Sequence, residues 1–208
     1  MGNTFKFAVA TLGLLLTLPA LAQSAAEQLR DRLAATDSMR GDFEQTLMDS
    51  DGTLLDDSSG EFAVQRPGQF YWHTREPYEQ LLVSNHEVVW LYDPDLEQAT
   101  LRQFTEDVQR TPALLLSGDL EKLQDNFVIE RLPDENDRSA YLLSPTEREG
   151  LFQELTLVFN ADVLTEIRLE DSLGQISVFA LSPAQRNQPI DAALFEFEPP
   201  EGVDIMTE

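Results

Sequence analysis

Apart from carboxylates, the chain has few side chains that could do acid, base or metal chemistry. Its 208 residues include 38 Asp and Glu, two histidines and no cysteine. His73 follows Trp72 in a predicted strand and His86 falls in a predicted turn, a spacing that fits neither a catalytic triad nor a His-rich metal site. The sequence contains no nucleophile elbow, Gly-rich phosphate loop or His-Glu-x-x-His motif. We therefore expect no enzymatic activity, no metal site and no cofactor, and we assign no carboxylate pair to acid–base catalysis.

One acidic segment has a partial likeness to a metal-binding motif. Residues 49–52 read Asp-Ser-Asp-Gly, as the start of a calcium loop does. The later ligands and the position of the glycine do not fit that loop. We interpret the segment as a hairpin turn, and weak surface binding of calcium stays open.

The composition limits the compartment and the partners of the chain. Residues 1–22 have an apolar run at 7–18 and end in Ala-Leu-Ala, which predicts a cleaved signal peptide. Residues 23–208 then form a single domain that begins with Gln23, so we expect neither a lipid-anchored cysteine nor a membrane span. The formal charge of −24, or −25 without Lys6, predicts repulsion of nucleic acid. Without cysteine, stability must come from packing.

The elements that must position any site are mostly short strands. Residues 26–34 predict an amphipathic helix. The expected strands are 42–48, 60–65, 69–74, 79–84, 87–92, 98–104, 127–132, 140–144, 152–159, 164–170 and 175–181, with a polar tail from Ser182. Their spacing favours a sandwich or a barrel. A second helix is predicted at 112–116, and its three consecutive leucines, Leu114, Leu115 and Leu116, cannot all face one core.

Several strands are apolar on both faces. In the segment 87–92, Val88, Trp90 and Tyr92 alternate with Val89 and Leu91. An antiparallel sheet with one wet face would alternate apolar with polar residues, so something must cover both faces. Either a helix or a ligand does so, and the pattern alone leaves both readings open.

Segments along the whole chain resemble those of one protein family. Residues 60–72, Gly-Glu-Phe-Ala-Val-Gln-Arg-Pro-Gly-Gln-Phe-Tyr-Trp, are similar to two strands of the outer-membrane lipoprotein carrier family, LolA. The likeness continues in order at 82–84, 90–94, 97–100, 111–112 and 191–203. The resemblance implies a mainly β fold, an unclosed antiparallel barrel of about 11 strands with a helical lid, and an apolar cavity for the acyl chains of lipoproteins.

The resemblance also implies roles for residues and partners. Arg66 matches the family's lid-closing arginine, although the residues alone favour an edge-strand arginine that aids solubility. The cavity would be lined by Phe43, Phe62, Phe70, Trp72, Trp90, Leu114, Leu115, Leu116 and Phe159, for which a plain core role is the alternative. The implied partners of this periplasmic monomer are lipoproteins, the ATP-driven inner-membrane complex LolCDE and the outer-membrane receptor LolB.

Three other functions fit the sequence less well. The receptor LolB needs an N-terminal cysteine for its lipid anchor, and regulators that contain a LolA-like domain carry a second domain. An esterase would need a nucleophile beside a base. The remaining alternative is a periplasmic protein of the same fold that senses lipids or lipoproteins without transporting them.

Overall fold

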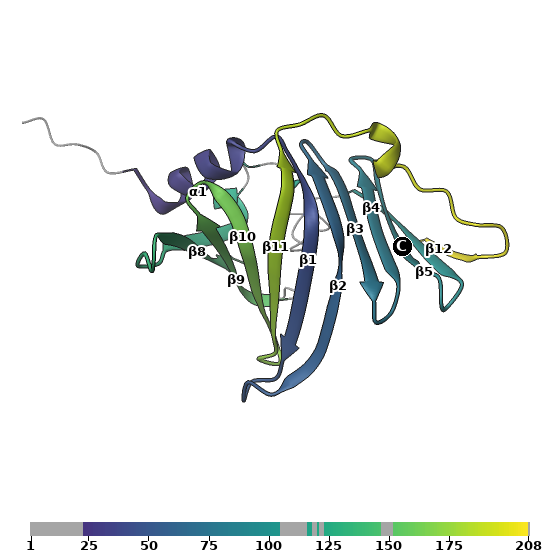
Figure 1. Ribbon diagram of the computed structural model, residues 1–208, viewed down its shortest axis with the longest axis horizontal. Helices are drawn as coiled ribbons and strands as arrows, with labels where there is room; N and C mark the ends of the chain where they lie inside the picture. Colours follow the sequence, from purple (N-terminus) through teal and green to yellow (C-terminus); the bar gives the residue numbers. More distant parts are fainter. Residues whose placement is uncertain (1–22, 105–115, 118–119, 121–122, 147–151, 208) are drawn as a thin grey trace, which may run out of the picture.

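The computed structural model describes residues 23–104, 116–117, 120, 123–146 and 152–207, so the predicted signal peptide lies outside the described residues. The described residues form one curved sheet of twelve strands, with short helices beside it (Figure 1). The strand order is β12-β6-β5-β4-β3-β2-β1-β11-β10-β9-β8-β7, and the sheet does not close on itself. The prediction of a mainly β, unclosed barrel is confirmed.

The strands lie close to the predicted positions. They are β1 (Ser38–Met48), β2 (Leu54–Gln65), β3 (Gln69–Glu76), β4 (Gln80–Asn85), β5 (Val88–Asp93), β6 (Gln98–Gln103), β7 (Phe127–Arg131), β8 (Arg138–Pro145), β9 (Phe152–Asn160), β10 (Val163–Asp171), β11 (Ile176–Arg186) and β12 (Asp204–Thr207). All neighbouring pairs are antiparallel except β12 with β6. The helical elements are α1 (Ala25–Ala34), α4 (Leu123–Asn126) and the 3₁₀ helix η2 (Ala192–Phe195).

Helix α1 begins where its sequence provides a cap. The Ser24 hydroxyl accepts a hydrogen bond from the Glu27 backbone N–H (3.2 Å), and the Glu27 carboxylate accepts one from the Ser24 N–H (2.8 Å). This reciprocal pair satisfies two N–H groups that have no partner within the helix. Leu29 and Leu33, one turn apart, are both buried and attach the helix to the sheet.

The two faces of the sheet have different roles. We call the face that carries the large buried cluster the inner face; it includes Phe43, Phe62, Phe70, Tyr141 and Phe159. The opposite, outer face is partly covered by the C-terminal segment, in which η2 packs against β3 and β4. The buried cluster and the C-terminal segment therefore cover part of each face of the central strands.

The hairpin of β1 and β2 is longer than predicted. Its turn is the segment 49–52, where the Asp49 carboxylate accepts hydrogen bonds from the N–H groups of Asp51 (3.0 Å) and Thr53 (2.8 Å). The interpretation of this segment as a hairpin turn is confirmed. The start of β2, residues 54–59, was not predicted because its Asp-Asp-Ser-Ser run has low β propensity. Backbone pairing with β1 holds it extended.

The C-terminal part of the chain also departs from the prediction of an irregular polar tail. Strand β11 continues to Arg186, and a register irregularity where it passes Arg40 and Gly41 of β1 accommodates the extra length. Residues 204–207 then form β12, which pairs with β6 at the edge of the sheet. A four-residue edge strand carries too short a pattern to be recognised in sequence.

Candidate functional site

The inner face is centred on a cluster of aromatic side chains around Trp72. Its indole stacks on Phe43 at a ring-centroid distance of 3.9 Å, and lies 5.9 Å from Phe62 and 6.0 Å from Phe70. Phe179 of β11 meets it edge-on at 5.5 Å. Strands β1, β2, β3 and β11 thus bring together four of the predicted cavity residues and one, Phe179, that the sequence reading assigned only to a strand.

Burial is graded across this cluster. Phe43, Phe62 and Phe70 are at most 2% exposed, whereas Trp72 is only partly buried. Other partly buried apolar side chains lie against the same core, and they are Leu82, Phe104, Leu120, Ile129, Leu169 and Phe179. The inner face therefore presents partly accessible apolar surface beside a fully packed core. Surface of this kind binds hydrocarbon without the need for polar groups.

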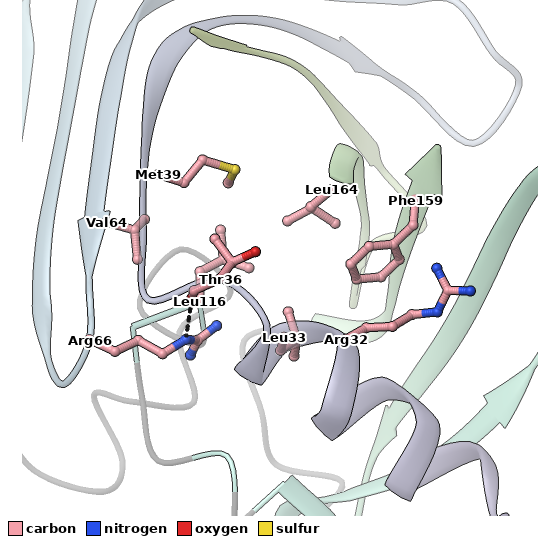
Figure 2. A pocket seen from close by; sticks show the side chains of 9 residues that line it. All are labelled: Arg32, Leu33, Thr36, Met39, Val64, Arg66, Leu116, Phe159 and Leu164. Carbon is pink, nitrogen blue, oxygen red and sulfur yellow. Dashed lines mark hydrogen bonds between the residues drawn. The ribbon is translucent and has the colours of Figure 1, made fainter. Parts of the chain in front are cut away.

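A second group of inner-face residues lies under α1. Figure 2 shows Phe159 and Leu164 facing Leu33 of α1, with Leu116 and Arg66 on the other side of a small pocket. The pocket has room for about one water molecule, ≈ 20 Å³. Ligand pockets span roughly 300–1,000 Å³, so this space is too small for an acyl chain in the conformation described.

Arg66 joins the end of β2 to the connection between α1 and β1. Its Nε donates to the Thr36 carbonyl (3.2 Å), and its backbone N–H donates to the carbonyl of Asp37 (2.9 Å). Burial lowers the pKa of Arg66 to about 10, and the charge of Asp37 opposes this shift. Its Nη1 is buried and has no hydrogen-bond partner among the described residues. The bond to Thr36 gives Arg66 a direct link to the segment that carries α1.

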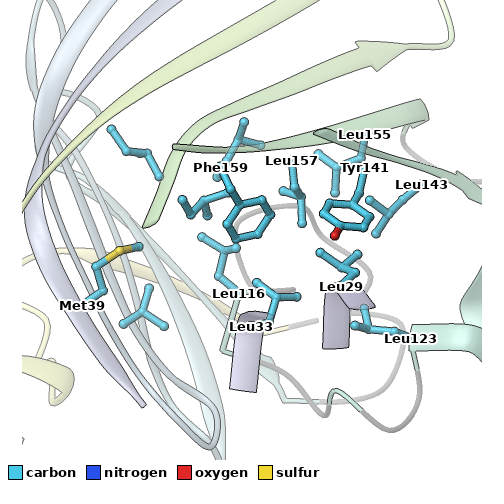
Figure 3. Close-up of a cluster of buried hydrophobic side chains, with 14 of the residues drawn as sticks. Leu29, Leu33, Met39, Leu116, Leu123, Tyr141, Leu143, Leu155, Leu157 and Phe159 are labelled. Carbon is cyan, nitrogen blue, oxygen red and sulfur yellow. The ribbon is translucent and has the colours of Figure 1, made fainter. Parts of the chain in front are cut away.

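Helix α1 covers the β8–β9 end of the inner face. Figure 3 shows Leu29 and Leu33 beside Tyr141 and Phe159. Arg32 donates from Nη1 to the carbonyl of Ala161 (2.5 Å), and its Cζ lies 5.6 Å from the ring centroid of Phe159. The helix is therefore held by two leucines and a few side-chain contacts, whereas the strands below it are held by continuous backbone ladders.

One predicted cavity residue, Trp90, is not brought to the inner face. Its ring meets Phe197 of the C-terminal segment at 5.7 Å, while its neighbour Val89 joins the inner core. The segment 87–92 is apolar on both faces, so the sequence could not say which face the cavity would use. Leu116 is buried, in a turn, and lines the pocket beside Arg66, whereas Leu114 and Leu115 lie outside the described residues.

Six residues that line the pocket were not among the predicted site residues, and they are Arg32, Leu33, Thr36, Met39, Val64 and Leu164. Arg32 lies on the polar side of the predicted helix, and Thr36 lies beyond its end. Nothing in their local pattern distinguishes them from surface residues. Met39 belongs to the first four residues of β1, which precede the predicted strand. A signal was present for Leu33, which the helical spacing places on the apolar face, and for Val64 and Leu164, which are apolar residues of predicted strands.

Among the described residues, none of the helices has the length and apolar character needed to cross a bilayer.

Comparisons with known proteins agree on one family. The model of "Outer membrane lipoprotein carrier protein LolA" matches residues 34–198. The outer-membrane lipoprotein carrier protein of Azotobacter vinelandii is 42% identical over 182 residues, which cover 88% of this chain and 87% of that protein. The protein of the same description from Chromohalobacter salexigens is 39% identical over 209 residues, with 99% of each chain covered.

A solved structure supports the fold alone. An uncharacterized conserved protein from Thermus thermophilus has a TM-score of 0.54 and 12% identity, with 89% of this chain and 100% of that chain covered. Sequence identity to the carrier proteins is much higher and extends over nearly the whole chain. The chain therefore belongs to the outer-membrane lipoprotein carrier family, LolA.

Proposed function

We propose that this protein is a periplasmic chaperone that binds the acyl chains of lipoproteins on the inner face of its sheet. Residues 23–208 would be the mature carrier, released from the signal peptide at 1–22. It would receive lipoproteins from the inner-membrane complex LolCDE and pass them to the outer-membrane receptor LolB. The observation that carries the proposal is the partly accessible aromatic surface around Trp72 in a chain of this family.

The need for such a carrier follows from the hydrophobic effect. Each buried methylene is worth about 0.8 kcal/mol, so exposing one 16-carbon acyl chain to water costs on the order of 12 kcal/mol. A triacylated protein cannot cross an aqueous compartment at that cost. A curved apolar face that is not closed can shield the chains and still release them sideways.

The small size of the pocket implies that binding opens the space under α1. Its leucines fill the inner face next to Phe159, where acyl chains would add to the surface around Trp72. We assign to Arg66 the role of holding this region closed, through its bond to the Thr36 carbonyl. Breaking one such bond to a charged group costs about 1.5–3 kcal/mol, so cargo that buries many methylenes can displace it.

The direction of transfer depends on relative affinity. Cargo moves on only if the next receptor holds the acyl chains at least as tightly as the carrier does. Apolar contacts without strong polar anchors favour such moderate affinity. The formal charge of −24 would also steer the carrier toward a basic receptor surface.

The carrier role is tested by release of lipoprotein from membranes. Spheroplasts that hold a radiolabelled triacylated lipoprotein are incubated with the purified mature protein, and the soluble fraction is assayed. We expect a soluble one-to-one complex. If all lipoprotein stays in the membrane fraction while a homologous carrier releases it, the carrier role is refuted and the sensing alternative becomes preferable.

The role of Arg66 is tested in the same assay. Arg66→Leu removes the donor to Thr36 but keeps an apolar side chain in the pocket, and we expect it to take up cargo and to fail in passing it to LolB. Arg40→Leu, an exposed arginine on β1, is the matched control and should behave as wild type. Normal transfer by Arg66→Leu would contradict the lid-closing role.

A further inference from the structure

Two hydroxyl groups are buried without a partner inside the apolar inner face. They are Ser139 Oγ and Tyr141 OH on β8, in side chains that are 6% and 0% exposed. Neither has a hydrogen-bond partner in the part of the chain that the structure describes. Buried hydroxyls are nearly always satisfied, so two unsatisfied ones on the same strand require an explanation.

Both hydroxyl-bearing residues adjoin one residue of the candidate site, Phe159. The β8–β9 register places Ser139 opposite Phe159 and Tyr141 opposite Leu157. The ring of Tyr141 meets that of Phe159 edge-on at 5.9 Å. The guanidinium of Arg66, whose Nη1 is the third buried atom without a partner among the described residues, lines the same pocket as Phe159 from the other side. Ser139 and Tyr141 are therefore both neighbours of Phe159, one of the residues that line the pocket under α1.

Packing alone does not explain the hydroxyls. Phenylalanine and alanine would fill the same space without burying an unpaired polar atom. Figure 3 shows the Tyr141 hydroxyl pointing from β8 toward Leu29 of α1, which offers it only hydrocarbon. Among the described residues these donors thus have no acceptor, and a bound ligand beside α1 can supply one.

We propose that Ser139 and Tyr141 form a polar subsite that donates hydrogen bonds to the ester or amide carbonyls of the cargo's acylated cysteine. The proposal rests on the carrier function proposed above. The three groups share one capacity, which is to donate, and they match a neutral ligand group that only accepts. Acyl chains lack such a group along their length and carry it where they join the glyceryl and cysteine units. The subsite thus recognises the junction between lipid and protein.

The test compares a ligand that has the carbonyls with one that lacks them. A synthetic tripalmitoylated lipopeptide and its analogue with alkyl ether and amine links in place of ester and amide links are titrated into the mature protein. We expect Tyr141→Phe and Ser139→Ala each to weaken binding of the acyl lipopeptide about five- to tenfold, the equivalent of one hydrogen bond. Affinity for the carbonyl-free analogue should not change.

The control is Tyr71→Phe, which removes a hydroxyl from the outer face. Tyr71 OH already has a partner, Glu61 Oε1 at 3.3 Å, and burial together with Glu61 raises the pKa of Tyr71 to about 12. This variant should bind both lipopeptides as wild type does. Thermal unfolding without ligand should show Tyr141→Phe and Ser139→Ala to be as stable as wild type or more so, because an unpaired polar atom is removed.

Four results would overturn the subsite. Unchanged affinity of both variants for the acyl lipopeptide would refute it and leave the carrier function intact. An equal loss for both lipopeptides would show a packing effect, and reduced thermal stability of the free variants would show that the hydroxyls already have partners. If wild type binds neither lipopeptide, the carrier function itself fails together with the subsite.

Discussion

Glu166 on β10 lies between two arginines on the outer face. Arg138 and Arg168 donate to its two carboxylate oxygens at 2.7 and 2.9 Å. Burial by itself would raise the pKa of Glu166, but the hydrogen bonds and charges of the two arginines outweigh it and hold the pKa below the ordinary value of 4.5. The three side chains connect β8 to β10 across β9.

Glu166→Gln should therefore lower stability in a pH-dependent way. A carboxylate whose pKa is depressed by folding stabilises the protein above its unfolded pKa, and this contribution is lost as pH falls through the folded pKa. We expect a loss of about 0.5–1 kcal/mol at pH 7, since the arginines are partly exposed to solvent. Urea unfolding at neutral pH and below pH 4 measures it. The difference in the free energy of unfolding between Glu166→Gln and wild type should disappear at the lower pH. The control is Glu154→Gln, at an exposed residue, which should be as stable as wild type at both pH values. A loss that does not depend on pH would refute the explanation.

Gly60 is the glycine at which the surrounding packing leaves least room for a side chain. A Cβ there would collide with the backbone carbonyl of His73 and lie 2.9 Å from Cε1 of Phe43. We expect Gly60→Ala to cost about 1–3 kcal/mol in the free energy of unfolding. Ser59→Ala on the same strand is the control and should cost less than half as much. Denaturant titration measures the free energy of unfolding of both variants. Equal losses for Gly60→Ala and Ser59→Ala would show that the backbone shifts freely at Gly60.

At the scale of elements, strand β5 presents one apolar face to the core and the other to the C-terminal segment. Val89 belongs to the inner core, while Trp90 and Tyr92 contact Phe197 at 5.7 and 5.2 Å. Trp72 and Trp90, the only tryptophans in the chain, therefore lie on opposite faces of one sheet. The fluorescence of each tryptophan therefore reports on one face of the sheet.

Single-tryptophan variants test which face binds acyl chains. Trp90→Phe leaves Trp72 as the reporter, and Trp72→Phe leaves Trp90. A lipopeptide with brominated acyl chains should strongly quench the fluorescence of Trp72 and leave that of Trp90 almost unchanged, because bromine quenches at short range. The unbrominated lipopeptide is the control for indirect effects. Stronger quenching of Trp90 would place the ligand on the outer face and contradict the site.

For the whole molecule, the excess of negative charge is the dominant long-range feature. The chain carries 38 acidic against 14 basic residues. Such an excess produces repulsion within the folded protein, which salt screens over a Debye length of about 10 Å at 0.1 M. The same charge would accelerate encounter with a basic partner at low salt.

Stability should consequently rise with salt. We expect the urea midpoint of unfolding to increase as NaCl is raised from about 0.05 M to about 0.5 M, where screening is several times stronger. Sucrose at the same osmolality is the control for effects of excluded solute. Over the same range the rate of cargo transfer to LolB should fall. A midpoint that is constant or lower at high salt would show that repulsion does not limit stability.

The sequence by itself determined the class of fold and located four of the five aromatic residues in the cluster around Trp72. Strand periodicity and turn residues reflect local backbone geometry, so the strands and the capped helix could be located from short segments. Phe43, Phe62, Phe70 and Trp72 come from adjacent strands with the same side-chain alternation, which brings them together on one face. The scarcity of histidine and the lack of cysteine, which are visible in the sequence alone, likewise limited the kinds of catalytic and metal site that could be expected.

Only the tertiary structure decided which apolar face carries the buried cluster that forms the candidate site. The local sequence does not say which face of the sheet Trp90 occupies. Its contact with Phe197, which is distant in sequence, shows that it lies on the outer face. The parallel pairing of β12 with β6 and the unpaired hydroxyls of Ser139 and Tyr141 within the described part of the chain likewise depend on segments far apart in sequence. Local patterns report how a side chain alternates along its own strand, whereas burial and hydrogen-bond satisfaction depend on whatever the rest of the chain places against it.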